Sequence, residues 1–149
     1  MKIISHRGNL TGPDPSTENT LRQFEIAISK GFEVEIDVWK IVEGTVWIGH
    51  DQGDSVMPKS FLEDNSSKIW VHAKSLQAVE SLRFMHGINW FWHENDRMTI
   101  TSKGYIWCYP GTYIDGGVSV VTQKDFQTDH DILGICTDFP ENFKRFQSL

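Results

Sequence analysis

The chain is poor in cysteine, in clustered positive charge and in long apolar runs. Its two cysteines, Cys108 and Cys136, form no Cys-x-x-Cys pair, so we expect reduced and mostly buried thiols rather than a disulfide framework. No run of four Lys or Arg occurs and the formal net charge is −6, which argues against nucleic acid and anionic lipid as partners. No apolar stretch has the length of a membrane span. The first residues lack the apolar core of a signal peptide, so we expect a cytoplasmic protein.

Repeats, low-complexity segments and linkers rich in Pro, Gly or Ser are also missing. A length of 149 residues with 39% hydrophobic and 12% aromatic content suits a globular protein with a sizeable core. We therefore expect a single domain over residues 1–149.

Strand and helix patterns alternate along the chain. Alternating or continuous apolar residues predict strands over 2–5, 32–39, 45–48, 68–73, 89–93, 105–109, 118–122 and 133–137. Capping and apolar spacing predict helices from Ser16 or Thr17 to Gly31, from Ser75 to Gly87, and after Asp138 and Pro140. This alternation favours an α/β fold with a parallel sheet.

Glu35 and Asp37 are two residues apart in a predicted strand, so both side chains leave the same face. Val34, Ile36 and Val38 occupy the opposite face, which leaves the two carboxylates pointing toward the interior or top of the sheet. Like charges there are costly unless a positive group lies between them, and a divalent cation such as Mg²⁺ or Ca²⁺ meets that need. The alternative is a solvated edge strand, where such a pair is ordinary.

His6 and His50 are candidates for acid–base chemistry, because imidazole titrates near neutral pH. One could remove a proton from a nucleophile while the other protonates a leaving alkoxide. Arg7 offers a forked donor suited to phosphate. The alternative for each histidine is a surface position, which fits His86 and His130 well.

Polar residues also follow the predicted parallel strands, where ligands bind in such sheets. They are His6-Arg7, Glu35-Asp37, His72-Lys74 and Thr137-Asp138.

Several motifs in order carry a family resemblance: His6-Arg7-Gly8, Glu18-Asn19-Thr20, Glu35-x-Asp37, His50-Asp51 and, near the end, Thr137-Asp138-Phe139-Pro140. This series resembles the glycerophosphodiester phosphodiesterases, within the wider group of phosphatidylinositol-specific phospholipase C-like enzymes. The resemblance implies a TIM-type barrel with its site at the carboxyl ends of the strands, acting on a small phosphodiester. It further implies a role for each matching residue: acid–base catalysis by His6 and His50, metal binding by Glu35 and Asp37, phosphate binding by Arg7 and Lys74, and support by Glu18 and Asn19.

The chain departs from the family pattern in two respects. Where the family carries Glu-x-Lys on its third strand, this chain has His72 and Lys74. His72 then becomes the third metal ligand and allows Mn²⁺ or Zn²⁺ beside Mg²⁺ or Ca²⁺, unless Glu94 or water takes that place. The chain is also short for a TIM barrel, so we expect a trimmed barrel with later crossover helices reduced to loops, its exposed strands covered by a second copy. A catalytically weakened phosphate-binding or assembly protein is the alternative function.

Overall fold

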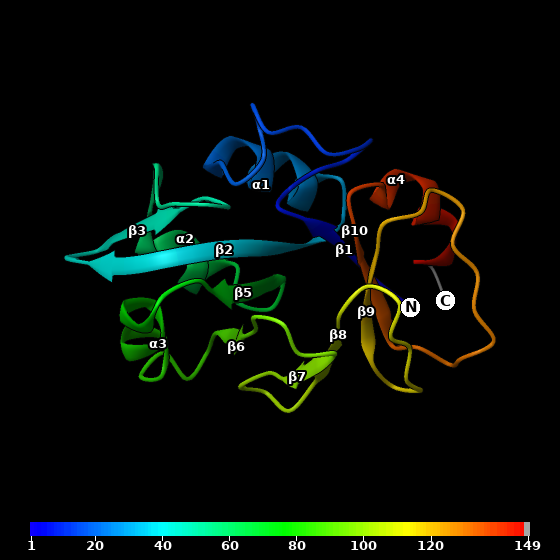
Figure 1. Cartoon of the computed structure of the whole chain (residues 1–149). Helices are drawn as coiled ribbons and strands as arrows, with labels where there is room; N and C mark the ends of the chain where they lie inside the picture. Colours follow the sequence, from blue (N-terminus) through cyan, green and yellow to red (C-terminus); the bar gives the residue numbers. More distant parts are fainter. Residues whose placement is uncertain (148–149) are drawn as a thin grey trace.

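A computed structural model describes residues 1–147 of the chain (Figure 1). The strands are β1 (Lys2–His6), β2 (Glu33–Val42), β3 (Thr45–Ile48), β4 (Ser55–Pro58), β5 (Ile69–Ala73), β6 (Asn89–Trp92), β7 (Met98–Ile100), β8 (Ile106–Cys108), β9 (Val118–Val121) and β10 (Gly134–Thr137). The helices are α1 (Leu21–Ser29), α2 (Lys59–Asp64), α3 (Leu76–Leu82) and α4 (Pro140–Phe143), with a 3₁₀ turn, η1 (Lys144–Phe146). Across residues 1–147 no helix has the length and apolar character needed to cross a bilayer.

The strands form one ten-stranded mixed sheet. Strands β6, β5, β2, β1, β10, β9 and β8 run parallel in that spatial order. Strand β3 pairs antiparallel with the C-terminal part of β2, and β4 pairs antiparallel with β3. Strand β7 pairs antiparallel with β8. The predicted α/β fold with a largely parallel sheet is therefore confirmed.

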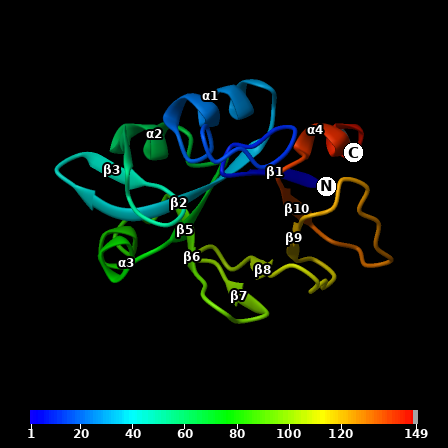
Figure 2. The ribbon, with the colours of Figure 1, turned by 45° about the horizontal axis from the view of Figure 1, so that its top comes forward.

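The sheet curls around but does not close (Figure 2). Within residues 1–147 no strand pairing joins β6 to β8; instead, the Ser102 N–H donates to the Trp90 carbonyl at 2.7 Å. The chain leaving β6 turns back as β7 against β8, so that hairpin occupies the place where a closing parallel strand would lie. The curved sheet thus agrees with the expected α/β architecture, whereas the expected trimmed barrel is not confirmed, because the sheet does not close within the described residues.

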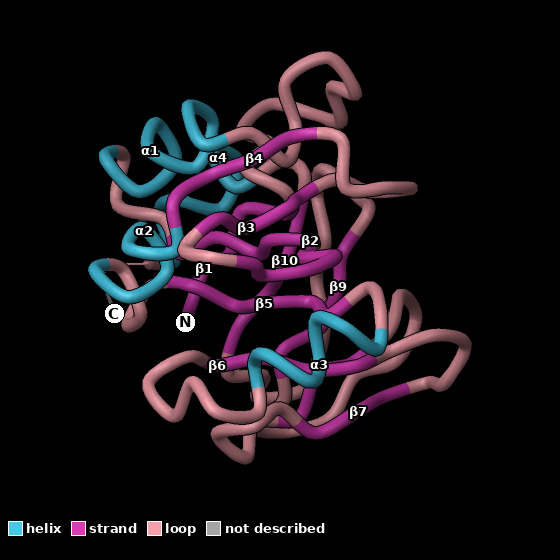
Figure 3. The backbone as a smooth tube through the Cα atoms, turned by 90° about the vertical axis from the view of Figure 1, so that its left-hand side faces the viewer, coloured by secondary structure: helices cyan, strands magenta, loops and turns pink. Residues whose placement is uncertain are grey.

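Helices cover only part of the sheet. Figure 3 shows α1, α2 and α4 together on one side of the strands. Between the end of α3 and the start of α4 the described chain consists of strands and loops and contains no crossover helix. The prediction that the later crossover helices are reduced to loops is confirmed.

Two apolar layers pack against the two faces of the sheet. Under α1, α2 and α3 lie the outward residues of β2 and β5, among them Val34, Ile36 and Val71. The inner face of the curl carries a second cluster: Ile4, Trp70, Phe91, Trp107, Val118 and Cys136. Each large side chain buried in this way contributes about 1.5–3 kcal/mol. Both cysteines are buried and unpaired, as predicted.

Some sequence-based boundaries are wrong. The first helix begins at Leu21 with Thr20 as its N-cap, not at Ser16 or Thr17. The Asp14 carbonyl accepts hydrogen bonds from the Thr17 and Glu18 N–H groups, and the turn they make ends in a left-handed Asn19 (φ 53°), which no helix can include. The helix α3 has the predicted Ser75 cap but ends at Leu82 instead of Gly87. Strands β4 and β7 and helix α2 were not predicted, because each is too short to show a periodic pattern.

Candidate active site

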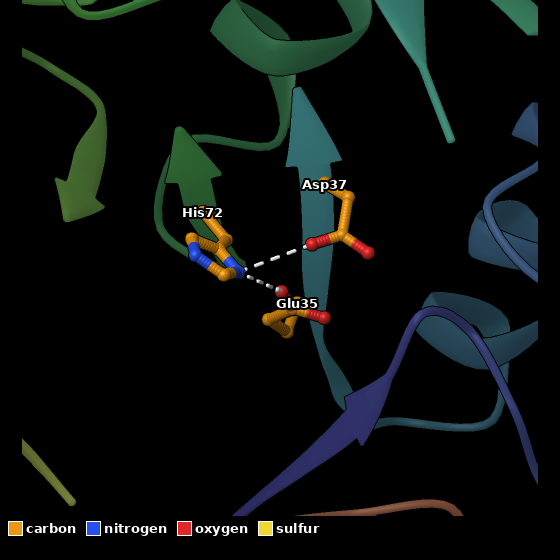
Figure 4. A group of neighbouring side chains, drawn as sticks. All are labelled: Glu35, Asp37 and His72. Atoms are coloured by element: carbon orange, nitrogen blue, oxygen red, sulfur yellow. Dashed lines mark ion pairs between the residues drawn. The ribbon is translucent and has the colours of Figure 1, made fainter. Parts of the chain in front are cut away.

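Strand register brings the carboxyl-end residues to one level of the sheet. His6 on β1 pairs with Glu35 on β2, and Asp37 two residues later pairs with His72 on β5. Figure 4 shows the His72 ring turned toward both carboxylates. The structure thus places together the side chains that sequence reasoning assigned to catalysis and metal binding on these strands.

The acidic pair is almost completely buried, since Glu35 is 2% and Asp37 1% exposed. The alternative of a solvated edge strand is therefore wrong. Burial and the charge of Asp37 raise the pKa of Glu35, although His6, His72 and Arg7 oppose this. Burial would also raise the pKa of Asp37, but the hydrogen bond from His72 and the charges of His72, Lys74 and Arg7 hold that pKa well below its usual range.

His72 connects the two carboxylates. Its Nδ1 lies 3.1 Å from Asp37 Oδ1 and 3.8 Å from Glu35 Oε1. Its Nε2 lies 3.0 Å from the His93 carbonyl oxygen, which can only accept, so Nε2 carries a hydrogen. In a neutral ring, Nδ1 then directs a lone pair at two carboxylate oxygens, an arrangement that is stable only if a proton or a cation lies between them.

The three side chains suit a divalent cation. Glu35, Asp37 and His72 each offer one ligand atom, all within 4.8 Å of one another. The Nε2–H bond to a backbone carbonyl is the kind of contact that orients metal-binding histidines. Glu94, the alternative third ligand, is exposed and does not belong to this group.

Arg7 lies against the same carboxylates in a left-handed conformation, φ 54°, followed by Gly8 at φ 81°. Its Nε lies 3.2 Å from Asp37 Oδ2, and its Nη1 donates to Glu18 Oε1 at 3.2 Å. Its backbone N–H points at Glu35 Oε2, 3.3 Å away. Glycine suits this turn because side chains rarely adopt its positive φ and because an added Cβ would lie only 3.0 Å from Gln23 Cγ on α1. Lys74 adds a second cation, with Nζ 3.9 Å from Asp37 Oδ1.

Asn19 fixes Asp37 from two sides. Its Nδ2 donates to Asp37 Oδ2 at 2.9 Å, and its Oδ1 accepts the Asp37 N–H at 3.1 Å. Glu18 holds Arg7, and its other oxygen accepts from Asn9 Nδ2 at 3.0 Å. The loop before α1 therefore orients both the acidic pair and the arginine, the supporting position that the family resemblance implies for Glu18 and Asn19.

His6 has a partner that sequence reasoning did not assign. Its Nδ1 lies 2.8 Å from Asp138 Oδ1, an oxygen that also accepts from Asn9 Nδ2 at 2.8 Å. Burial alone would lower the pKa of His6, but the Asp138 hydrogen bond and the charge of Glu35 raise it above its ordinary value. Asp138 could have been found from its place after the last strand, whereas nothing in the sequence marks Asn9, which is buried.

His50 occupies a loop at the rim of the site. Its side chain is 43% exposed, and Nδ1 lies 2.7 Å from Asp51 Oδ1. It lines a pocket of about 410 Å³ together with Arg7, Glu18 and Asn19. His50 and His6 share no hydrogen bond or ion pair in the described part of the chain, and each pairs with a different aspartate.

Comparisons with known proteins agree with this arrangement at the level of the fold. No protein-family model matches the chain, and no curated protein matches it by sequence. The crystal structure of glycerophosphodiester phosphodiesterase from Agrobacterium tumefaciens str. C58 matches with a TM-score of 0.56 and 15% identity, over 100% of both chains. A protein of Silicibacter pomeroyi DSS-3 assigned as a glycerophosphoryl diester phosphodiesterase matches with a TM-score of 0.57 and 14% identity, over 99% of this chain and 92% of that one. The chain therefore has the fold of glycerophosphodiester phosphodiesterases, and the resemblance drawn from its motifs is confirmed at that level.

Proposed function

We propose that this chain is a metal-dependent phosphodiesterase that hydrolyses a glycerophosphodiester-like substrate, with His6 and His50 as the acid–base pair. The observation that carries the proposal is the convergence of buried carboxylates, histidines and cations at the carboxyl ends of β1, β2 and β5. The fold shared with glycerophosphodiester phosphodiesterases supports it.

The positively charged groups of the site bind the phosphate. Glu35, Asp37 and His72 would hold a divalent cation, which would supply positive charge beside the bound phosphate. Arg7, oriented by its contacts with Glu18 and Asp37, adds a forked donor directed by the fold. Arg7 and Lys74 together stabilise the negative charge that accumulates on the phosphoryl group in the transition state.

Proton transfer falls to the two histidines. Asp138 accepts the Nδ1–H of His6, which leaves the Nε2 lone pair free to take a proton from the nucleophile. His50, at the rim, donates a proton to the departing alkoxide. If the nucleophile is water, the products are a phosphomonoester and an alcohol; if it is a neighbouring hydroxyl of the substrate, a cyclic phosphate forms first.

The decisive experiment is hydrolysis of glycerophosphodiesters by the purified chain, with and without a chelator. We expect activity that the chelator removes and a divalent cation restores. His6→Ala and His50→Ala should each lose about 10²–10⁴-fold in rate, while His86→Ala, which changes an exposed histidine, should not. Full activity in chelator, or in either site variant, would contradict the assignment.

The alternative is a phosphate-binding or assembly protein. Met98 (50% exposed) and Ile100 (70% exposed) on β7 favour it, because they leave apolar surface on the unclosed side of the sheet. Phosphodiester binding without turnover, in a protein that self-associates through β7, would support this function over the enzymatic one.

A further inference from the structure

We propose that the Glu35–Asp37–His72 site selects a first-row transition dication, such as Mn²⁺ or Zn²⁺, over Ca²⁺. The inference rests on the proposed metal site but concerns which ion that site accepts. It follows from three features of the described residues: the ring nitrogen that faces the carboxylates, the number of free carboxylate oxygens, and the rigidity of the side chains.

The nitrogen ligand is fixed by the backbone. The His93 carbonyl takes the Nε2–H of His72 at 3.0 Å, so the other ring nitrogen, Nδ1, is the atom that faces Asp37 and Glu35. The ring cannot easily turn away, because it stacks on Phe91 with centroids 5.0 Å apart and an interplanar angle of 17°. Imidazole nitrogen suits Zn²⁺ and other borderline ions, whereas Ca²⁺ and Mg²⁺ take oxygen ligands.

In each carboxylate, one of the two oxygens already contacts Arg7 or Asn19. Glu35 Oε2 is directed at the Arg7 N–H, and Asp37 Oδ2 accepts from Asn19 and faces Arg7 Nε. The remaining oxygens, Oε1 and Oδ1, are the ones that face His72 Nδ1. Ca²⁺ binds six to eight oxygens, often through bidentate carboxylates, and these contacts oppose bidentate binding here because they already occupy the second oxygen of each carboxylate. An ion of lower coordination number is satisfied by two single oxygens, one nitrogen and water.

The side chains are also held in place. Asp37 is clamped by both ends of the Asn19 amide, and Glu35 is buried within β2. Ca²⁺ sites rely on adaptable geometry, so a rigid set of three single donors disfavours that ion further. All three features therefore lead to the same selectivity.

The test is metal binding by the full chain after chelator treatment, measured by calorimetry with Mn²⁺, Zn²⁺, Mg²⁺ and Ca²⁺ as separate probes. We expect Mn²⁺ and Zn²⁺ to bind at least about tenfold more tightly than Ca²⁺. In protein labelled with ¹⁵N-histidine, bound Mn²⁺ should show hyperfine coupling to one ring nitrogen in electron paramagnetic resonance. His72→Glu should abolish that coupling and lower the Mn²⁺ to Ca²⁺ affinity ratio by about tenfold or more.

The matched control is His86→Glu, which makes the same replacement at an exposed histidine and should change neither measurement. If circular dichroism shows that His72→Glu does not fold, His72→Gln replaces it and should lose the nitrogen coupling as well. Equal or tighter binding of Ca²⁺ overturns the inference, as does binding of no ion at all. Selective Mn²⁺ binding without hydrolysis supports the inference and refutes the proposed function. Hydrolysis that Ca²⁺ supports best would support the proposed function and overturn the inference.

Discussion

Replacing Gly49 by alanine tests whether the His50 loop has to keep its observed path. Gly49 follows β3 at φ +153°, and a Cβ there would lie 1.9 Å from the Gln52 carbonyl oxygen. Its own carbonyl accepts the Trp39 Nε1–H at 2.7 Å, and its N–H donates to the Asp37 carbonyl at 3.2 Å. An added methyl group must therefore displace the backbone that carries His50, at a point tied directly to the metal-binding strand.

The expected loss can be worked out from these contacts. A residue forced into a backbone region that glycine alone occupies costs roughly 1–3 kcal/mol. Weakening the Trp39 hydrogen bond adds about 1 kcal/mol. We expect Gly49→Ala to lower the free energy of unfolding by about 2–4 kcal/mol. Each kcal/mol of lost stability should lower the melting temperature by about 2–4 °C. A displacement of His50 by about 1 Å should reduce kcat about 100-fold.

Gly44→Ala is the matched control. Gly44 also has a positive φ, +79°, but a Cβ there would meet nothing within 4 Å, and the turn lies beyond the site. It should cost about 1–2 kcal/mol from strain alone and leave kcat unchanged. Urea unfolding and hydrolysis rates are measured for both variants. If Gly49→Ala were as stable and as active as Gly44→Ala, the reasoning about this loop would be refuted.

Three further predictions concern groups around the site. Asp138→Asn should lower the pKa of His6, measured by NMR titration of the metal-free protein, because the hydrogen bond and charge that raise it are lost. A raised pKa means that the folded state binds this proton more tightly than the unfolded chain; His6 therefore stabilises the wild type below pH 6.5, and this contribution disappears as the pH rises through the folded pKa. Asp37→Asn should abolish the stabilisation by Mn²⁺, which for the wild type is about 2.7 kcal/mol at an ion concentration of 100 times Kd, read from melting curves with and without the ion. Thr20→Ala removes the cap that accepts the Gln23 N–H and should cost about 1 kcal/mol in urea unfolding without changing metal affinity.

Local patterns predicted the strands that carry the site. The period-two alternation around Glu35 and Asp37 separates buried apolar residues from inward carboxylates, and β2 has those two faces. Because parallel strands present their carboxyl ends at one edge, the assembly of His6 and His72 beside that pair also followed from sequence. These inferences needed only the direction of side chains along each strand.

What could not be predicted depends on contacts between distant parts of the chain. The place of Asp138 after the last strand is visible in the sequence, but its contact with His6, 132 residues away, depends on β1 lying beside β10. Asn9 joins Asp138 to Glu18, a role that no spacing reveals. Barrel closure likewise depends on whether β6 reaches β8, and the sequence between them gives no signal that β7 turns back.

The charges at the site explain why a histidine suits position 72. Four carboxylates and two permanent cations meet there: Glu18, Glu35, Asp37 and Asp138, with Arg7 and Lys74. With all four carboxylates ionised and the histidines neutral, two negative charges remain, which one divalent cation balances. A glutamate in place of His72 would add one negative charge, so the same bound ion would leave this group of side chains with a net charge of −1. A neutral ligand at this position keeps the metal while leaving the positive charge of the ion, Arg7 and Lys74 available to the substrate.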